Sequence, residues 1–572
     1  MVERIVADVV VAGSGIGGMS AAIRAHDLGA SVALVEKADH VGGATAWSGG
    51  QVWVGANHVA MDAGLDDTVD ETLAYVAAIA GAHPDLFDPV RAAEWVGAAV
   101  EATRWFSDVG VIEWELIPDY PDYYFPDAPG SKPTGRYLTG APFDGTSLGD
   151  DRKLLVDAPH WPMGITYGEM FAWGGLSSRD RWDRGVMARR RADDVLTFGQ
   201  GIAAAFLRGV LDREILLYTG REVTGLVTDG DAVSGVWATG ATGELEVRGA
   251  VILATGAHDW SRDLVDRWIG TPAEDGGSVA PASVAGDVVA VAGPVGAATA
   301  TVPGTAAPII PGYRLSVPAF EGDTGFRACF EHCLPHTVMV NRRGERFCDD
   351  SFHPAVIAGA LAEDASGERP NLPFFMIWDE RHHERYGLGA TGPGEAYPEG
   401  LVSSAGSLQD LAGMLGIDAA GLAATVARFN GSAERGEDPD FGRGSNASVR
   451  RFRGDGDHEP NPNVGSIDEA PFHGMRMRLL NTGIAAGGLV TGAAGAVLRP
   501  DGSPIPGLFA AGECVTRISG GGAGYNSGYS LSRAMTYGYL AADALAAGPP
   551  AAGADAAATP GAGPGYPTTR RN

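Results

Sequence analysis

Cysteine and positive charge are scarce in this sequence. Its 572 residues include only four cysteines, Cys329, Cys333, Cys348 and Cys514, whereas a disulfide scaffold would need far more. Against 71 Asp and Glu there are 42 Lys and Arg, which gives a net charge of −29. Such a field repels nucleic-acid phosphates and anionic lipid headgroups, so we expect no nucleic-acid partner.

Signals for membrane insertion and export are also missing. No apolar run reaches the roughly 18 residues of a membrane-spanning helix. The opening residues, MVERIVADVV, lack the basic and apolar regions of a signal peptide. We therefore expect no membrane span and a cytoplasmic location.

Glycine, in contrast, is abundant. It accounts for 84 residues, roughly double its usual share, which predicts many tight turns and close backbone approaches. A hydrophobic content of 45% with 20% charged residues is typical of a globular protein. The length exceeds the roughly 250–300 residues at which one core splits into domains, so at least two domains are expected.

The N-terminal region has the pattern of a βαβ unit. The apolar run 6–11 predicts a buried parallel strand, and GSGIGG follows it at 13–18. A helix-like segment then leads to a second apolar run, 31–35, which ends at Glu36. A glycine motif between strand and helix, with an acid after the next strand, predicts dinucleotide binding.

Each residue of this pattern has a physical task. Gly13 permits the tight turn, Gly15 lets the backbone approach a pyrophosphate, and Gly18 allows close helix–strand packing. The N-terminus of the helix offers free N–H groups to the phosphates. Glu36 is placed to accept hydrogen bonds from ribose hydroxyls and to repel a 2′-phosphate.

Similar elements recur near the other end of the chain. The runs VILATG at 251–256 and GLFAAGE at 507–513 predict buried strands, and a helix-like run follows the second. In the segment between them, periodicity predicts a helix over 407–435 and a hairpin over 338–347. We therefore predict the following division: a cofactor-binding domain at 1–300 and 473–547, an inserted catalytic domain at 301–472, and a disordered Pro/Ala/Gly tail at 548–572.

Five landmarks resemble a flavoprotein family that contains fumarate reductases and 3-ketosteroid dehydrogenases. They are GSGIGG, Glu36, GGATAWSGG at 42–50, VNRRGERF at 340–347, and GLFAAGE with the later SGYSLSRA. The resemblance implies an α/β fold, with a Rossmann-like FAD-binding domain of the glutathione-reductase type and an inserted α+β capping domain. It implies FAD without NAD(P), and no second GxGxxG follows a strand. Electrons would then leave to an external acceptor such as a quinone, oxygen or a partner protein.

The resemblance also assigns cofactor contacts. Glu36 would hold the adenosine ribose, Glu513 would reach the ribityl chain, and Ser530 and Leu531 would lie beside the pyrimidine end of the flavin. No histidine stands in GGATAWSGG, so no covalent histidyl link is expected there. The residues expected to bind FAD are Gly13, Ser14, Gly15, Gly17, Gly18, Glu36, Lys37, Gly43, Ala44, Thr45, Ser48, Gly49, Gly50, Ala254, Gly256, Asp287, Gly512, Glu513, Ser530 and Leu531.

The expected type of reaction is judged from the positions at which this sequence differs from fumarate reductases and from ketosteroid dehydrogenases. Cys333 stands where fumarate reductases carry a proton-donating arginine. This difference argues against a fumarate-reductase-like ene-reductase, which is kept as the alternative. The stretch DYPDYYF at 119–125 is similar to ketosteroid dehydrogenases, and Tyr123 matches an active-site tyrosine there. The tyrosines of Δ1-type enzymes are missing from 349–354 and 518–522. Instead, Tyr525-Asn526-Ser527 resembles the Tyr-x-Ser of Δ4-(5α)-dehydrogenases.

We therefore expect an FAD-dependent desaturase of a cyclic ketone, above all a 3-ketosteroid. A base removes the α-proton, and the β-hydrogen leaves as hydride to flavin N5. Tyr525 is the expected proton acceptor, Ser527 a relay, and the N–H of Gly528 or Gly522 a donor to the developing enolate. Tyr123 and Tyr313 are candidates for the opposite wall and, with His353, for the base if Tyr525 does not fill that role.

Three other interpretations were weighed. Cys329, His332, Cys333 and His336 would share one face of a helix and could bind zinc, but no distant ligand pair is evident and we expect no metal. The segment 160–175, which includes Trp161, Met163, Met170 and Trp173, could roof an apolar pocket or belong to the core. A non-catalytic flavin-binding protein would not need Tyr525 and Ser527, so an enzyme is preferred.

Overall fold

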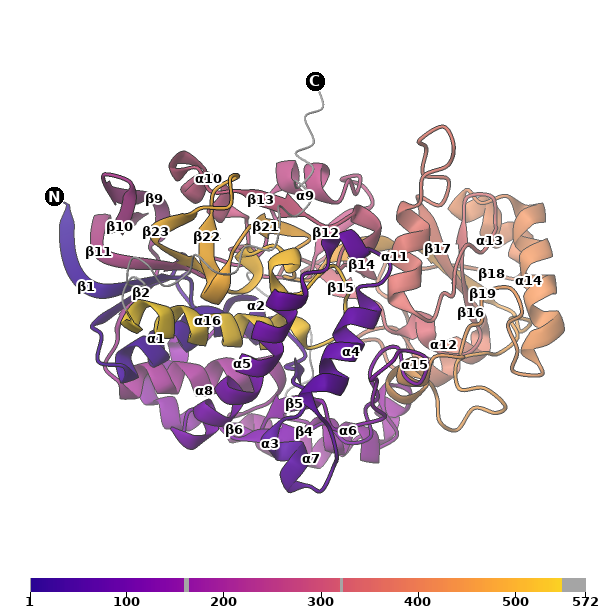
Figure 1. Cartoon of the computed structure of the whole chain (residues 1–572). Helices are drawn as coiled ribbons and strands as arrows, with labels where there is room; N and C mark the ends of the chain where they lie inside the picture. Colours follow the sequence, from indigo (N-terminus) through magenta and orange to yellow (C-terminus); the bar gives the residue numbers. More distant parts are fainter. Residues whose placement is uncertain (1, 159–163, 319–322, 548–572) are drawn as a thin grey trace.

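The computed structural model describes residues 2–158, 164–318 and 323–547. A largely parallel sheet forms the centre of the cofactor-binding part, in the order β22-β23-β11-β1-β2-β8 (Figure 1). Strands β9 and β10 extend it as an antiparallel meander from β11. The strands are β1 (Glu3–Ala12), β2 (Val32–Val35), β8 (Leu216–Tyr218), β9 (Glu222–Asp229), β10 (Ala232–Gly240), β11 (Gly243–Leu253), β22 (Ala496–Leu498) and β23 (Pro504–Ala510).

The central strand β1 is apolar on both sides because both faces of the sheet are covered. Val9 and Val11 belong to one hydrophobic core cluster, and Val10 and Ala12 belong to another, as strand alternation requires. The first cluster includes residues of the helices α1 (Ile16–Asp27), α5 (Pro89–Asp108), α8 (Phe198–Asp212) and α16 (Tyr529–Ala547). The predicted βαβ unit is therefore present, and α16 packs directly against α1.

Two four-stranded sheets form the capping part, which extends away from the large sheet (Figure 1). The first has the order β12-β20-β14-β15, and the second has the order β16-β17-β19-β18. Their strands are β12 (Gly276–Ser278), β14 (Ile310–Arg314), β15 (Phe326–Ala328), β16 (Thr337–Asn341), β17 (Phe374–Trp378), β18 (Ser403–Ala405), β19 (Phe472–Arg476) and β20 (Arg478–Asn481). The helices of this part are α11 (His353–Leu361), α12 (Glu380–Tyr386), α13 (Leu408–Leu415), α14 (Ala419–Ala433) and α15 (Ala447–Arg453).

Shorter elements complete the described chain. The segment between β2 and α8 carries a small sheet in the order β3-β5-β4. The strands of this small sheet are β3 (Val52–Trp53), β4 (Trp114–Leu116) and β5 (Tyr137–Gly140). Two further strand pairs are β6 (Phe143–Asp144) with β7 (Val195–Leu196), and β13 (Thr299–Thr301) with β21 (Gly487–Leu489). The helices are α2 (Gly43–Trp47), α3 (His58–Asp62), α4 (Val69–Ile79), α6 (Tyr167–Ala172), α7 (Arg184–Ala192), α9 (Arg262–Trp268) and α10 (Asp287–Ala292).

Local sequence patterns in the capping part were only partly right. The predicted hairpin over 338–347 is wrong, because β16 pairs with the distant β17 and ends in a tight turn closed by Asn341 and Glu345. The helix predicted over 407–435 is two helices, since Gly416 ends α13 with a φ of 71°. The domain boundaries stay a prediction, and β12 and β20, which pair, lie outside 301–472. Within the described residues, no helix is long and apolar enough to cross a membrane.

Candidate active site

A cavity of about 660 Å³ joins the glycine turn after β1 to the loop before α16. All the residues predicted to bind FAD except Gly18 line it. The predicted catalytic residues line the same cavity: Tyr123, Tyr313, Tyr525, Ser527 and Gly528. Residues from both ends of the sequence therefore share one site.

The glycine turn needs its glycines for two different steric reasons. Gly13 has a φ of 104°, and a Cβ there would lie 2.3 Å from the carbonyl oxygen of Ala254. A Cβ on Gly18 would lie 1.8 Å from the carbonyl oxygen of Gly13. Gly18 thus lets the helix pack against the turn, which explains why it does not face the cavity.

Glu36 stabilises this turn as well as facing the cavity. Its Oε2 accepts hydrogen bonds from the backbone N–H and the hydroxyl of Ser14, at 2.9 and 2.6 Å. Its Oε1 accepts from the N–H of Ala38 at 2.8 Å. Because a carboxylate oxygen has two acceptor positions, Oε1 retains one for a ribose hydroxyl.

The other end of the cofactor region lies at the start of α16. Gly528, Ser530 and Leu531 line the cavity there, beside Glu513. Glu513 accepts a hydrogen bond from the N–H of Ala485 at 2.7 Å, and burial raises the pKa of its carboxyl. The N-terminus of this 19-residue helix directs its positive dipole end toward the cavity.

These features fit FAD. The glycine turn at the N-terminus of α1 offers backbone N–H groups to a pyrophosphate. Glu36 retains an acceptor for a ribose, and the second glycine cluster, 42–50, lines the cavity between the turn and the start of α16. The predicted contacts are therefore gathered along one continuous surface of suitable chemistry.

Three aromatic rings form the wall at the far end. The ring centroids of Tyr123, His353 and Tyr525 lie 5.8–6.0 Å apart, and each pair is edge-to-face. Burial raises the pKa of Tyr525, although the Arg517 guanidinium, 5.6 Å from the ring centroid, opposes the shift. Burial lowers the pKa of His353 well below its usual value, so its ring is neutral.

The loop that carries Tyr525 is held by Asn526, which is completely buried. Its side-chain oxygen accepts hydrogen bonds from the hydroxyl of Tyr75 at 2.7 Å and from the N–H of Tyr123 at 3.2 Å. Its amide nitrogen donates to the hydroxyl of Tyr137 at 2.9 Å. Asn526 therefore fixes the two predicted active-site tyrosines relative to each other.

The hydroxyl of Ser527 points elsewhere than expected. It donates a hydrogen bond to the side-chain oxygen of Gln51, and Gln51 also lines the cavity. No hydrogen bond joins Ser527 to Tyr525 among the described side chains. A proton relay from Tyr525 through Ser527 would thus need a rearrangement or an intervening molecule.

Below Tyr123 lies a buried ion pair. Asp122 accepts hydrogen bonds from the indole N–H of Trp53 at 2.7 Å and from Arg136 at 2.9 Å. Arg136 also pairs with Asp67, so one guanidinium bridges the two carboxylates. The pair anchors the chain immediately before Tyr123.

Sequence reasoning missed part of the site and expected His353 only as an alternative base. Gln51, Phe330, His353, Phe452 and Arg453 all line the cavity. Arg453 donates a hydrogen bond from Nη1 to Nδ1 of His353 at 3.0 Å. These two residues are 100 positions apart, so no local motif connects them.

Tyr313 lies in β14, across from this wall. It is 3% exposed, and a Cβ on Gly389 would lie 2.0 Å from its hydroxyl oxygen. Tyr313 therefore packs closely against the 389–393 segment, which also lines the cavity. Its contribution here is to the shape of the opposite wall.

The four residues weighed as a zinc site do not lie on one helical face. Cys329 follows β15, and His332 and Cys333 belong to a single 3₁₀ turn. His332 is bonded to the carbonyl oxygen of Asp350 at 2.5 Å, and His336 to that of Ser466 at 2.7 Å. Among the described residues, no group of three or more His, Cys, Asp or Glu could hold a metal ion.

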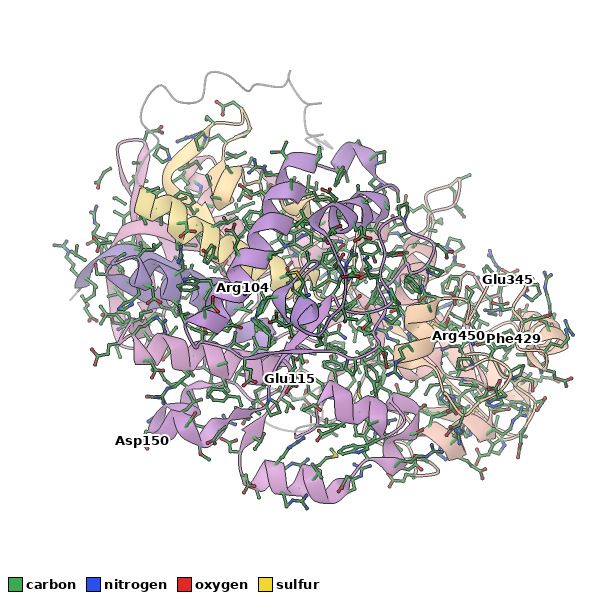
Figure 2. The ribbon with its side chains drawn as sticks, turned by 60° about the horizontal axis from the view of Figure 1, so that its bottom comes forward. Arg104, Glu115, Asp150, Glu345, Phe429 and Arg450 are labelled. Carbon is green, nitrogen blue, oxygen red and sulfur yellow. The ribbon has the colours of Figure 1, made fainter. Side chains whose placement is uncertain are left out.

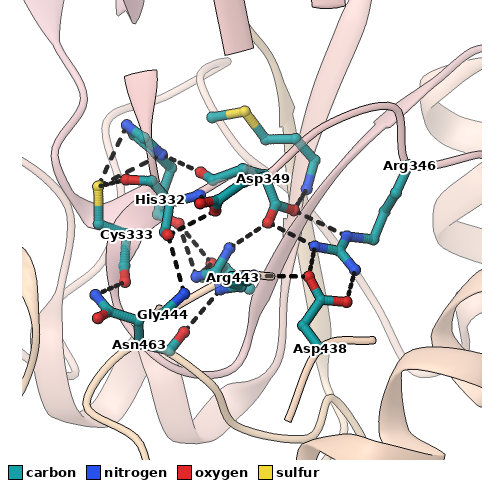
Figure 3. A network of polar contacts seen from close by, with 12 residues as sticks. His332, Cys333, Arg346, Asp349, Asp438, Arg443, Gly444 and Asn463 are labelled. Atoms are coloured by element: carbon teal, nitrogen blue, oxygen red, sulfur yellow. Dashed lines mark hydrogen bonds and ion pairs between the residues drawn. The ribbon is translucent and has the colours of Figure 1, made fainter. Parts of the chain in front are cut away.

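A polar network holds this turn in place (Figure 3). Arg443 pairs with Asp350 at 2.7 Å and donates to the carbonyl oxygen of His332 at 2.8 Å. Arg346 pairs with Asp350 and with Asp438. The turn that carries Cys333 is therefore part of a rigid, charge-neutralised support.

The two residues of the segment 160–175 discussed above that the structure describes, Met170 and Trp173, pack in or against the core, which is one of the two interpretations given for this segment. Trp161 and Met163 lie outside the described residues. Met170 is fully buried in the main core, and Trp173 packs against that core. The following segment, 176–187, lines the cavity instead, through Leu176, Arg179, Asp180, Trp182, Arg184 and Met187.

Comparison with known proteins gives a consistent result. A family model described as an FAD binding domain matches residues 8–532. The chain is 34% identical to a 4-oxocyclohexanecarboxylate 2-dehydrogenase of Sinomonas cyclohexanicum, over 93% of this chain and 92% of that protein. It is 30% identical to a 3-oxosteroid 1-dehydrogenase of Mycolicibacterium smegmatis, over 94% and 96% of the two chains.

A solved structure is also similar. A 3-ketosteroid Δ1-dehydrogenase of Sterolibacterium denitrificans superposes with a TM-score of 0.86 at 29% identity, and covers 95% of this chain and 99% of that chain. The predicted fold, the FAD cofactor and the class of oxidoreductase are thereby confirmed. The comparisons support membership of the wider ketosteroid dehydrogenase group. They do not single out the predicted Δ4-(5α)-like branch, because the similar proteins named here include 1-dehydrogenases.

Proposed function

This chain belongs to the FAD-binding-domain family, and from that premise we propose that it desaturates a cyclic ketone next to the carbonyl group. One observation carries the proposal. The cavity that begins at the glycine turn ends at the wall made by Tyr123, His353 and Tyr525. A ketone held against that wall would lie beside the flavin region at the start of α16.

The chain's own residues supply the acid–base chemistry. Bound FAD would accept the two electrons, as hydride from the β-carbon. Tyr525 takes the α-proton, with Arg517 and Arg453 supplying positive charge that favours the deprotonated phenol. The backbone N–H of Gly528 donates to the carbonyl oxygen as negative charge develops on it. Asn526 holds Tyr525 and Tyr123 in place.

We propose that the Tyr525-x-Ser527 pattern indicates the position of the new double bond. If the substrate is a 3-ketosteroid, the pattern favours desaturation of the Δ4-(5α) type. The relatives named as 1-dehydrogenases make Δ1 the outcome to be tested against it. An external acceptor, such as a quinone, oxygen or a partner protein, would reoxidise the enzyme.

Anaerobic mixing tests the proposal. The FAD-loaded enzyme is mixed with saturated and Δ4 3-ketosteroids and with 4-oxocyclohexanecarboxylate, and flavin absorbance is followed while products are identified by mass spectrometry and NMR. We expect bleaching of the flavin and formation of a conjugated enone. If no cyclic ketone bleaches the flavin, while the reduced enzyme is reoxidised by an unsaturated acid, the chain is an ene-reductase.

A further inference from the structure

Arg453 is a buried cation that faces the cavity without an acidic partner among the described residues. It is the last residue of α15, is 7% exposed and lines the cavity. Its Nη1 donates to His353, and its guanidinium carbon lies 4.9 Å from the centroid of the Phe330 ring. No Asp or Glu of the described chain forms an ion pair with it.

The groups nearest to Arg453 do not supply negative charge. Burial raises the pKa of the Cys333 thiol to about 11, and burial also raises the pKa of Tyr525. The pKa of His353 is lowered by burial and by Arg453 itself. At neutral pH these three groups are therefore uncharged, and the positive charge of Arg453 is uncompensated.

Arg443, ten residues earlier, is a buried arginine with an acidic partner, whereas Arg517 and Arg533, which are also buried and have no ion pair among the described residues, do not line the cavity as Arg453 does. Arg443 is 2% exposed, pairs with Asp350 at 2.7 Å and donates to the carbonyl oxygens of His332 and Leu334 at 2.8 Å. Its charge is neutralised and its donors are satisfied. Because burying a charge without a partner is costly, the different treatment of Arg453 points to a partner that arrives with the substrate.

Two other arginines that line the cavity, Arg179 and Arg184, do not provide an equivalent site. Arg179 donates to Glu331 at 3.3 Å and to the carbonyl oxygen of Tyr386 at 2.9 Å. Arg184 donates to the carbonyl oxygen of Arg179 and is exposed. Of these three arginines, Arg453 combines burial with the absence of an acidic partner among the described residues.

We propose that Arg453 binds a carboxylate of the substrate, so that the preferred ketone is an anionic one, a ring that carries both a keto group and a carboxylate. A guanidinium offers several N–H donors in one plane, which suits a carboxylate. One donor is engaged by His353 and another by the sulfur of Cys333, and the remaining donors are available to the ligand. This inference rests on the proposed function for the keto group but not for the binding of the carboxylate.

Binding of a ligand without a keto group tests the site directly. The FAD-loaded enzyme is titrated calorimetrically with cyclohexanecarboxylate and with cyclohexanecarboxamide. We expect the acid to bind about 10- to 100-fold more tightly than the amide, the scale of a charged hydrogen bond. Arg453→Gln should abolish this preference, and Arg453→Lys should retain part of it. Equal binding of acid and amide by the unmodified enzyme, or an unchanged preference in Arg453→Gln, would overturn the proposal.

A matched control lies on the same helix. Arg450 is exposed and does not line the cavity. It lies on the capping part of the molecule (Figure 2). Arg450→Gln removes the same charge from α15 and should leave the preference for the acid intact. Flavin content and circular dichroism report whether each variant folds, and the Arg453→Lys variant preserves the test if the glutamine variant does not fold.

Turnover separates recognition from catalysis. With 4-oxocyclohexanecarboxylate and its methyl ester, Arg453→Gln should lower kcat/KM for the acid much more than for the ester. An equal loss with both would assign Arg453 to the ketone or to folding, and the proposal would fail. If neither compound and none of the 3-ketosteroids bleaches the flavin while the acid is still bound preferentially, the proposed function fails and the carboxylate site stands.

Discussion

The two ends of the cavity are built from different parts of the chain. At the end where the glycine turn lies, the residues 13–17 and Glu36 that line the cavity come from one short βαβ unit. At the ketone end, Tyr123, His353 and Arg453 come from three distant segments. Backbone geometry dominates the first end, whereas side chains held by tertiary packing dominate the second. Substitutions at the two ends should therefore affect different properties: FAD binding at the first end, and stability and reaction rate at the second.

The largest effect is expected in the support below the ketone end. Arg443→Met leaves the buried Asp350 without one of its two arginine partners, and breaking such a pair costs about 3–5 kcal/mol of folding free energy. Urea-induced unfolding of the FAD-loaded protein should show the loss. Arg428→Met, which breaks an exposed pair with Asp440, should leave the transition unchanged. Similar transitions in the two variants would contradict this assignment.

The next effect concerns the reaction. Tyr525→Phe removes one oxygen and retains the ring, so FAD content should be preserved while flavin reduction slows by about 10²-fold or more. Because burial raises the pKa of Tyr525, the deprotonated fraction grows as pH rises. The rate in the unmodified enzyme should therefore increase up to at least about pH 10, and the variant should lose this dependence. Stopped-flow absorbance decides, and a variant reduced at the normal rate would remove Tyr525 from the mechanism.

At the cofactor end, Glu36→Arg should weaken FAD binding by about 1–3 kcal/mol, because charge-assisted hydrogen bonds are lost. The turn should also loosen, since Glu36 accepts from both the N–H and the hydroxyl of Ser14. The ratio of flavin to protein absorbance after dialysis measures the effect. Glu101→Arg, an equal charge change at an exposed position of α5, is the control. Full occupancy in Glu36→Arg would count against the ribose role.

The smallest effect is expected for Ser527→Ala. Its hydroxyl is bonded to Gln51 and not to Tyr525, so it supports the loop more than it moves the proton. We expect flavin reduction to slow by about tenfold or less, the scale of one neutral hydrogen bond. A loss as large as that of Tyr525→Phe would show instead that Ser527 acts in the proton path.

The sequence predicted the cofactor end better than the ketone end. The glycine turn and Glu36 were predicted from a short pattern that has one physical meaning, the start of α16 was predicted through resemblance, and all three line the cavity. Tyr123 and Tyr525 were found through resemblance, and their 6.0 Å approach was visible only in the structure. His353 was expected only as an alternative base, and Arg453 was missed, because nothing near either residue in the sequence indicates its partner.

The capping part shows the same limit. The strand β16 was expected to fold back on its own continuation, but it pairs with β17, more than thirty residues later. The turn at 341–345 satisfies its backbone groups locally and does not reveal which strand lies alongside. Strand pairing across a long interval depends on burial of both faces, which a local pattern cannot specify.

By itself, the sequence determined the βαβ unit and a dinucleotide-binding turn, because the steric demands of Gly13 and Gly18 and the charge of Glu36 act within about thirty residues; that the dinucleotide is FAD was implied by the family resemblance. Only the tertiary structure decided what the other end of the cavity recognises. There, Arg453 lines the cavity and is surrounded by a neutral histidine, a neutral thiol and an aromatic ring. Whether a buried charge is neutralised depends on which groups the fold brings within a few ångströms of it.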